Sequence, residues 1–272
     1  MGLLSYLKST ILSKWVMAIT GCILVLFICG HAVGNLQILL GSDTYNTYAA
    51  FLQGLGEILW IIRIGLFVCL VLHLITSIRL KLLNNSARPT AYQYKSFLKA
   101  KLTSRTMIWT GIMIFAFLTY HLLHFTAGVT NPVEYDQHEV VINGKSGIAQ
   151  EIPNDPRILA QLPPTLQTTT VDGKLYAVQE EVKTAETRHD VYKMVVLGFR
   201  NPITSLVYII GVILLGFHLS HAIQSMFQTA GFNHPKYTPW IIQGSNALAV
   251  IVVLCLISIP ITILTGLVGG TI

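Results

Sequence analysis

The stretch WVMAITGCILVLFICGHAVGNLQILL, Trp15–Leu40, decides the fold of this chain. It contains no Asp, Glu, Lys or Arg, and it exceeds the roughly 20 apolar residues that a helix needs to cross a bilayer. A cleaved secretory signal has a shorter apolar region that is followed by a small-residue cleavage site, and this stretch has neither feature. We therefore expect a membrane-spanning helix that is retained in the protein.

Four further stretches have the same character. Only 11% of the 272 residues are charged and 53% are hydrophobic, whereas a soluble domain has roughly 25% charged residues. The composition predicts an all-α membrane protein with five transmembrane helices. The four further spans are Ile58–Ile78, Met107–Val129, Ile203–Gly231 and Trp240–Val268. The apolar residues of Met1–Ser13 lie near one helical face, which predicts a helix in the membrane interface.

Basic residues set the expected orientation of these spans. The connection between the second and third spans, Arg79–Arg105, is rich in Lys and Arg and contains no acid. Lys8 and Lys14 precede the first span, and Lys236 lies between the fourth and fifth. The positive-inside rule therefore predicts a cytoplasmic N-terminus and a C-terminus outside. The net charge of +6 then faces anionic lipid or an acidic protein partner.

The one long stretch outside the membrane, Thr130–Asn201, has β-hairpin signals. Asn143-Gly144 and Asp172-Gly173 each stand between β-forming residues, which is typical of tight hairpin turns. We expect a small extracytoplasmic β-rich insertion. The predicted organisation is an interfacial helix with the first three spans in 1–129, the insertion in 130–201, and the last two spans in 202–272.

The four cysteines, Cys22, Cys29, Cys69 and Cys255, all lie inside predicted spans. No cysteine lies in a loop that an oxidising compartment would reach, so we expect no disulfide. Their predicted role is that of small buried hydrophobic residues.

Four histidines stand inside four different predicted spans. An ionisable side chain in the hydrocarbon region is costly, so each one is a candidate functional residue. At about 1.5 Å per residue, His31 and His121 fall in the outer half of their outward-running helices. His73 and His218 fall in the inner half of two inward-running helices. The topology therefore predicts two histidine pairs at two depths.

Two imidazoles at one depth are the axial ligands that a six-coordinate haem requires. We therefore predict two b haems, an outer one bound by His31 and His121 and an inner one bound by His73 and His218. The alternative is that these histidines join helices by hydrogen bonds. His124 and His221 each follow a predicted ligand by three residues, on nearly the same helical face, and they are alternative ligands or haem-contacting residues.

Three further polar residues are candidates near the outer side. Arg63 is the only charged residue inside a predicted span, where it either pairs with a propionate of the outer haem or extends to the interface. Gln53 and Glu57 stand at the outer mouth of the second span. They are candidate quinone-binding residues, although polarity at a helix end explains them equally well.

The segments around these histidines resemble the cytochrome b membrane anchor of succinate dehydrogenases and fumarate reductases, in the single-chain, five-helix, two-haem class. The resemblance covers the five spans and their flanks. It is carried by KWVMAITG (14–21), GHAVGNLQ (30–37), VLHL (71–74), TYHL (119–122), DVYKMVV (190–196), GFRNP (198–202), GFHLSH (216–221) and SMFQT (225–229). One departure is Gly216, which stands where the fumarate-reductase branch has a proton-relaying glutamate. A second is the insertion at 130–188, which is longer than in compact members.

The resemblance implies a subunit that carries electrons from an iron–sulfur subunit through two bis-histidine haems to menaquinone. It further implies a flavoprotein with FAD and an iron–sulfur partner on the cytoplasmic side of a bacterial cytoplasmic membrane. The chain has no dinucleotide-binding motif and no cysteine ligand cluster, so we do not expect it to oxidise succinate alone. Alternatives are an anchor of another quinone-linked dehydrogenase, such as a hydrogenase or formate dehydrogenase, and a proton-coupled transporter.

Overall fold

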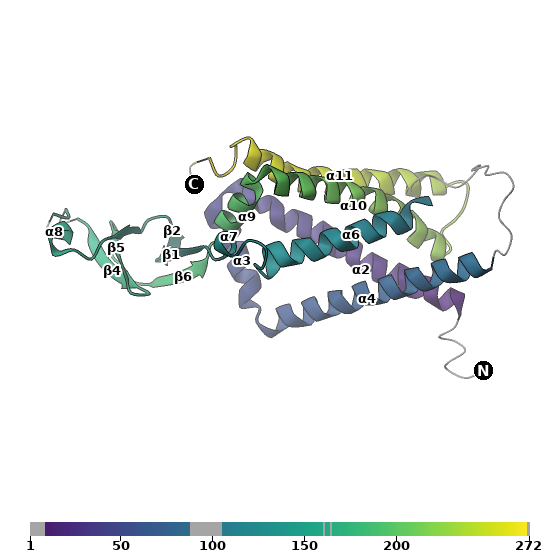
Figure 1. The fold of residues 1–272 in the computed structure, drawn as a ribbon, viewed down its shortest axis with the longest axis horizontal. Helices are drawn as coiled ribbons and strands as arrows, with labels where there is room; N and C mark the ends of the chain where they lie inside the picture. The colour runs from purple at the N-terminus through teal and green to yellow at the C-terminus, as the bar shows by residue number, and fades with distance from the viewer. Residues whose placement is uncertain (1–8, 88–104, 160, 164, 271–272) are drawn as a thin grey trace. The chain divides into compact units, whose positions relative to one another are not determined.

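The computed structural model describes residues 9–87, 105–159, 161–163 and 165–270, and within them the chain is predominantly helical (Figure 1). Five of its helices are long and apolar enough to cross a membrane, as the sequence predicts. They are α2 (Thr10–Leu36), α4 (Glu57–Ser86), α10 (Pro202–Thr229), α11 (Thr238–Leu264) and α6 (Met107–His121), which reaches this length only with the π-helix that continues it to Thr126. These helices indicate a membrane protein.

The first helix begins earlier than predicted. Helix α2 starts at Thr10, so Thr10–Ser13 belong to the first span and not to a separate interfacial helix. Ser13 is buried, and the Arg79 guanidinium of α4 donates a hydrogen bond to its hydroxyl at 2.7 Å. This bond joins the start of α2 to α4. The rest of the predicted interfacial helix, residues 1–8, lies outside the described residues, as does most of the basic connection after α4.

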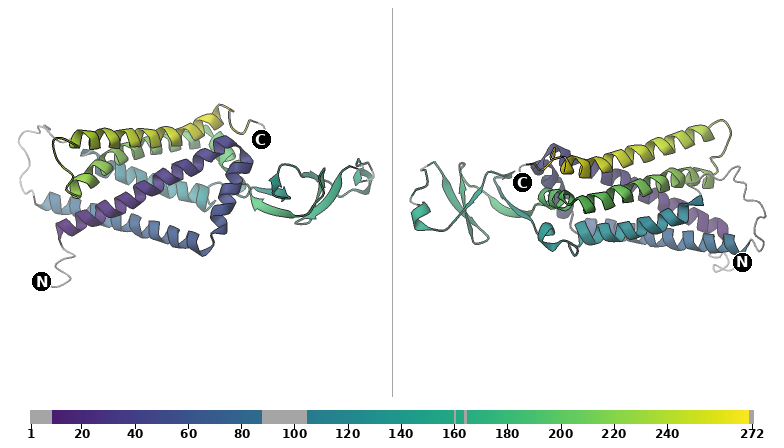
Figure 2. Two further views of the ribbon diagram at one scale, coloured as in Figure 1. Left: turned by 180° about the vertical axis from the view of Figure 1, so that it is seen from behind. Right: turned by 45° about the horizontal axis from the view of Figure 1, so that its top comes forward.

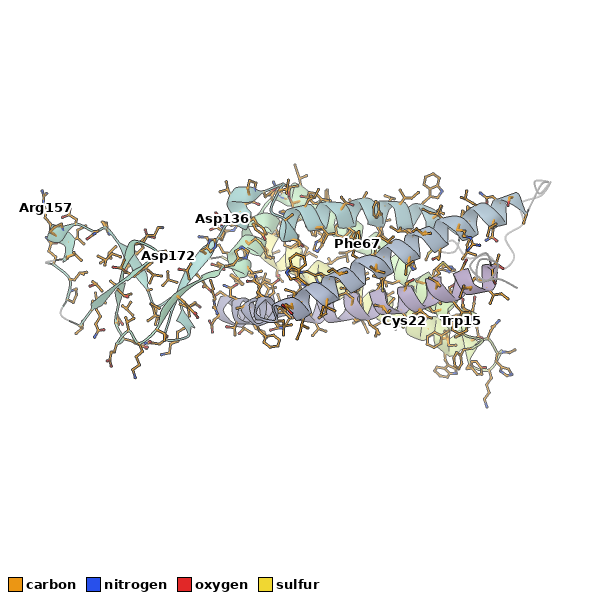
Figure 3. All side chains as sticks on the ribbon, turned by 90° about the horizontal axis from the view of Figure 1, so that it is seen from below. Trp15, Cys22, Phe67, Asp136, Arg157 and Asp172 are labelled. Atoms are coloured by element: carbon orange, nitrogen blue, oxygen red, sulfur yellow. The ribbon has the colours of Figure 1, made fainter. Side chains whose placement is uncertain are left out.

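The surface of the long helices is strongly apolar, as the side chains in Figure 3 show. Phe67 is 65% exposed and Trp240 is 74% exposed, although a water-soluble protein would bury most side chains of this kind. Lipid tails are the natural surroundings for such a surface. Cys22 is also exposed, so the prediction that all four cysteines are buried is wrong for this residue. A thiol is apolar enough to face lipid at little cost.

The chain forms two compact units. The first comprises residues 1–36, 55–120 and 203–261, and the second comprises 37–54, 121–202 and 262–272. In the first unit, α10 and α11 lie side by side (Figure 2). Their buried core also includes α2, and its members are Val25, Leu219, Ile223, Ala249 and Val252. These buried apolar side chains come from three helices, and their packing holds the first unit together.

Glycines allow close helix contacts in the first unit. A Cβ atom at Gly211 of α10 would lie 2.5 Å from the Phe117 ring of α6, and one at Gly216 would lie 2.5 Å from a Val253 methyl of α11. Both distances are too short for any real Cβ atom, so each position requires glycine if the helices keep this separation. Tyr208 extends the contact between α10 and α6, because its ring packs edge-on against Phe117 at 5.3 Å.

The second unit contains two small antiparallel sheets, with strand orders β2-β1-β6 and β3-β5-β4. Both predicted hairpins are confirmed. Asn143 and Gly144, and likewise Asp172 and Gly173, all have positive φ, as a two-residue primed turn requires. The strands are β1 (His138–Ile142), β2 (Lys145–Ser146), β3 (Gln150–Ile152), β4 (Gln167–Val171), β5 (Lys174–Val178) and β6 (Ala185–His189).

The second unit also contains helices that the sequence reading did not predict. The larger ones are α3 (Ser42–Gly54) and α9 (Val191–Arg200). Helix α9 begins at an N-cap, Asp190, whose side chain accepts a hydrogen bond from the Lys193 amide. Short helical turns are η1 (Gln37–Leu40), the π-helix η2 (Leu122–Thr126), α7 (Pro132–Tyr135) and α8 (Pro156–Leu159). The insertion is therefore mixed in structure, with helices as well as strands.

Candidate functional site

Two of the four predicted ligands come together in the first unit. His73 lies on α4 and His218 on α10, and both side chains are partly buried. His218 interacts electrostatically with His73 and with His221, which follows it on the same helix. Such an interaction is expected between the two histidines of one pair, and the inner pair stays a prediction from the sequence.

Each of these two imidazoles rests against a Thr-Gly pair on a neighbouring helix. Thr20 Oγ1 lies 3.4 Å from Nδ1 of His73, and a Cβ atom on Gly21 would lie 3.4 Å from the same ring. On the other side, Thr110 Oγ1 lies 3.3 Å from Nδ1 of His218, and a Cβ atom on Gly111 would lie 3.6 Å from that ring. In both contacts a threonine hydroxyl lies near Nδ1 of the imidazole and the next residue is glycine. The Thr-Gly pair lies on α2 for His73 and on α6 for His218. Thr20 and Thr110 were not among the candidates from sequence.

His31 lies at a different level of the same unit. It follows Gly21, which contacts His73, by ten residues on α2, and this is about 15 Å along a helix. The His31 ring stacks on Phe27 with ring centroids 5.5 Å apart. His31 and His73 therefore occupy two separate levels along α2, as two separate sites would require.

His121 and His124 belong to the second unit, and a π-helix separates their environments. His121 ends α6, whereas His124 lies within η2, where the Ala127 amide bonds to the Leu122 carbonyl over the wider π-type turn. The prediction that both lie on nearly the same helical face assumed a regular α-helix, and it is wrong for that reason. The pairing of His121 with His31 stays a prediction from sequence.

Neighbours within the chain account for the burial of His124. Its side chain is only 2% exposed, and its ring stacks on Phe125 with centroids 4.0 Å apart. A Cβ atom on Gly198 of α9 would lie 3.2 Å from the His124 ring, so glycine there allows α9 to pack closely against it. We therefore keep His121 as the proposed ligand and interpret His124 as a packing residue of the second unit.

A polar cluster in the first unit was also missed from sequence. The Oδ1 atom of Asn246 on α11 accepts hydrogen bonds from the Ser220 hydroxyl at 2.7 Å and from the Gln224 amide at 3.2 Å. Both donors lie on α10, on the turns after His218. Amide and hydroxyl side chains form hydrogen bonds across helices in lipid, so this cluster joins α10 to α11 on the turns after His218. Its only signal in the sequence is an Asn within an apolar run.

Gly216 has a packing role in this structure. The Val253 methyl of α11 fills the space in which a side chain at position 216 would project. Any side chain there would need Val253 to shift, so a glutamate at position 216 does not fit the present packing of α10 against α11.

The outer candidate residues are spread over different elements. Arg63 is exposed on α4, and its guanidinium lies 5.2 Å from the Trp60 ring centre. Arginine stacked on tryptophan at a helix surface is typical of a membrane interface, which favours the interfacial alternative for Arg63. Glu57 is the first residue of α4, but Gln53 lies on α3 in the other unit. The expectation that both stand on one span is therefore wrong, because Gly56, with φ +54, interrupts the helix.

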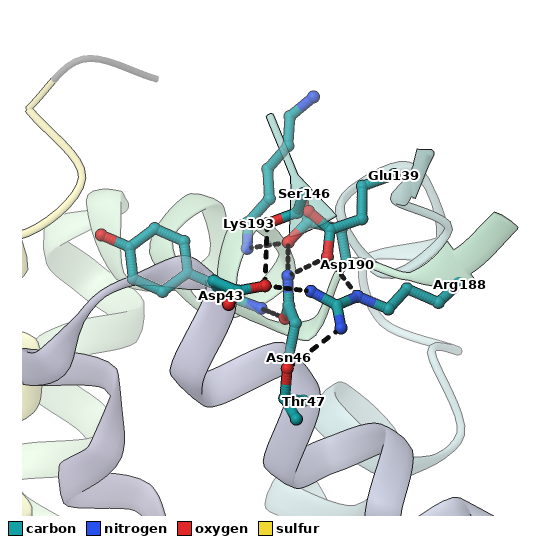
Figure 4. A network of polar contacts seen from close by, with 9 residues as sticks. Asp43, Asn46, Thr47, Glu139, Ser146, Arg188, Asp190 and Lys193 are labelled. Atoms are coloured by element: carbon teal, nitrogen blue, oxygen red, sulfur yellow. Dashed lines mark hydrogen bonds and ion pairs between the residues drawn. The ribbon is translucent and has the colours of Figure 1, made fainter. Parts of the chain in front are cut away.

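A polar clasp joins α3 to the sheet and to α9 within the second unit (Figure 4). Its centre is Asn46, which is fully buried. The Asn46 amide donates to Glu139 and to Asp190, both at 2.8 Å, and its oxygen accepts from the Tyr192 amide at 2.8 Å. This side chain uses its donors and its acceptor on β1 and on the start of α9, and so it joins α3 to both elements.

Arg188 extends the clasp at its exposed side. Its guanidinium bonds to Glu139, to Asp43 at 3.0 Å and to Thr47 at 3.2 Å. Partial burial opposes the charged form of Arg188, but the bonds to Glu139 and Asp43 outweigh it and raise the pKa of the guanidinium. The arginine therefore stays charged and balances the carboxylates around Asn46.

No family model, curated protein or solved structure matches this chain.

Proposed function

We propose that this chain is a dihaem cytochrome b that anchors a succinate:quinone oxidoreductase in the membrane. The observation that carries the proposal is the approach of His73 and His218 from two apolar helices, each imidazole resting on a Thr-Gly pair. An intramembrane ionisable residue is a functional candidate by default, and two that interact electrostatically strengthen the case.

The residues of the first unit fit a haem better than a metal ion held by protein ligands alone. Among the described residues, no three His, Cys, Asp or Glu side chains gather closely enough to hold a metal ion. A haem iron needs only two ligands from the protein, since the porphyrin supplies the others. His73 and His218 would hold the inner haem. His31 and His121 would hold the outer one, and the second pair rests on the sequence alone.

Bis-histidine haems supply one-electron transfer and have no open coordination position for oxygen. The chain contributes the imidazole donors, the apolar helices that exclude water, and the separation of two sites by about 15 Å along α2. These features suit a protein that conducts electrons across the membrane between two partners.

We infer the partners from the resemblance and from charge. The flavoprotein with its FAD and the iron–sulfur subunit would dock on the cytoplasmic side, where the positive-inside rule places the basic segments and the N-terminus. The membrane would be a bacterial cytoplasmic membrane, with the C-terminus outside. Menaquinone would be reduced at the outer end, and Glu57 and Gln53 are the proposed quinone-binding residues.

The test is purification of the chain with its partners from membranes in mild detergent. We expect a flavoprotein and an iron–sulfur protein to co-purify and succinate to reduce the bound haem. Reduction by formate or hydrogen but not by succinate would assign the anchor to a different dehydrogenase. Absence of haem from the purified complex would reject the proposal and favour a transporter.

The same preparation tests the outer residues. Glu57→Gln is expected to slow reduction of a menaquinone analogue while succinate still reduces the haem, because only the quinone step needs the carboxylate. Equal quinone turnover in both proteins would remove Glu57 from the quinone site.

A further inference from the structure

The Thr20 hydroxyl has one hydrogen, and the structure shows where that hydrogen goes. Thr20 Oγ1 donates to the Val16 carbonyl at 2.7 Å, one turn earlier on α2, with the Met17 carbonyl at 3.2 Å as a second acceptor. The contact from Oγ1 to Nδ1 of His73 at 3.4 Å must therefore use a lone pair of the threonine oxygen. The ring nitrogen is then the donor in this contact.

Thr110 repeats this arrangement on α6. Its hydroxyl donates to the Met107 carbonyl at 3.0 Å, and its oxygen lies 3.3 Å from Nδ1 of His218. The hydroxyl hydrogen is again committed to the backbone, so Nδ1 of His218 must donate.

We propose that Thr20 and Thr110 are positioning residues that keep the hydrogen of His73 and of His218 on Nδ1. The lone pair of each neutral imidazole then lies on Nε2, the nitrogen that does not face the threonine. The hydroxyl at Nδ1 also restricts the orientation of each ring. A hydrogen bond from the second ring nitrogen is the usual means by which proteins fix the tautomer of a metal-binding histidine.

The arrangement is duplicated in the chain. Thr20-Gly21 precedes His31 on α2 by the same interval as Thr110-Gly111 precedes His121 on α6. Each of these two helices thus presents a Thr-Gly pair to a histidine of the inner pair and a histidine of its own ten residues after the glycine. The role as ligand positioner rests on the proposed function, whereas the tautomer follows from the hydrogen bonds alone.

The first experiment measures the tautomer by nitrogen NMR of histidine-labelled full-length chain in its reduced, diamagnetic state. Single His→Gln variants assign the signals. We expect Nδ1 to carry the hydrogen in His73 and His218, and we expect T20V and T110V to shift the Nδ1 signal of His73 and His218, respectively. Hydrogen on Nε2 in the unmodified protein would overturn the proposal, whether or not the chain binds haem.

The second experiment measures the redox potential and absorption of the inner haem in the same variants. A donor bond at Nδ1 makes the imidazole more basic and favours ferric iron, so T20V and T110V should raise the potential of one haem component only. T20S and T110S should restore it. T119V is the matched control. The Thr119 hydroxyl also donates to its own helix backbone, at the Phe115 carbonyl, but among the described residues no hydrogen bond from it to a histidine is seen.

The outcomes separate the two ideas. A chain without haem rejects the proposed function and leaves the NMR result to decide the tautomer. A chain with two haems in which T20V and T110V behave like T119V, in both measurements, rejects the role of the threonines and leaves the proposed function standing.

Discussion

Replacing either His73 or His218 with alanine is expected to remove the same haem component, whereas replacing His31 or His121 removes the other. A six-coordinate haem that loses one of two axial ligands loses both affinity and its low-spin spectrum. Each variant should therefore retain one of the two proposed haems. The measurement is haem content together with the reduced-minus-oxidised spectrum of each purified variant.

Two neighbouring histidines are the controls for this series. His221 follows His218 on the same helix, and His124 is packed against Phe125, so His221→Ala and His124→Ala should each leave both components in place. If His221→Ala abolishes the inner component and His218→Ala does not, the ligand assignment is wrong by one helical turn. Loss of a single shared component from His31→Ala and His73→Ala would reject the two-depth pairing altogether.

The second large effect is expected at the polar clasp of the insertion. Asn46→Ala removes two hydrogen bonds to carboxylates and leaves the Tyr192 amide without the acceptor that the wild-type side chain provides. Bonds to charged groups contribute about 1.5–3 kcal/mol each, and they are not additive, so we expect the local free energy of unfolding to fall by roughly 2–3 kcal/mol. That corresponds to a roughly 30- to 150-fold faster amide exchange in β6 and α9.

Hydrogen exchange measured by mass spectrometry on the detergent-solubilised chain tests this prediction. Asn154→Ala is the matched control, because Asn154 is exposed in the same unit. Exchange in Asn46→Ala that equals exchange in Asn154→Ala would show that the clasp does not stabilise the insertion.

The spans and hairpins could be predicted because each depends on a local requirement. A helix that crosses a bilayer needs about 20 apolar residues, and the five stretches that meet this length in the sequence match the five candidate spans among the described residues. Likewise, Asn143-Gly144 and Asp172-Gly173 tolerate positive φ, so the turns and the strands beside them follow from a few residues.

The missed elements depend on distant partners. Helix α3 is polar and short, and it is held by Asn46 bonds to residues far along the chain. The start of α9 is fixed by its N-cap, Asp190, which also accepts a hydrogen bond from Asn46 much earlier in the chain. A hydrogen bond from Arg79 to Ser13 joins the first turns of α2 to α4. The two residues are far apart in the sequence, so no local pattern predicts that bond.

The candidate site divides in the same way. Depth along a helix follows from counting residues, so the inner histidines could be proposed from the sequence. The hydroxyls of Thr20 and Thr110 could not, because a threonine that bonds to its own helix backbone resembles any other threonine in a span. The identical spacing of Thr-Gly and histidine in two spans was the available signal. The π-helix at Leu122–Thr126 has no comparable signal, and it changed the relation of His121 to His124.

Binding of two haems through paired histidines is tested most directly by the haem-to-protein ratio of the purified wild-type chain, measured together with its reduced and oxidised spectra. We predict two low-spin b haems per chain, with different potentials and with no change in spectrum on exposure of the reduced protein to carbon monoxide, because both axial positions are filled. A purified, folded chain without haem, or with a single haem that binds carbon monoxide, would contradict the account.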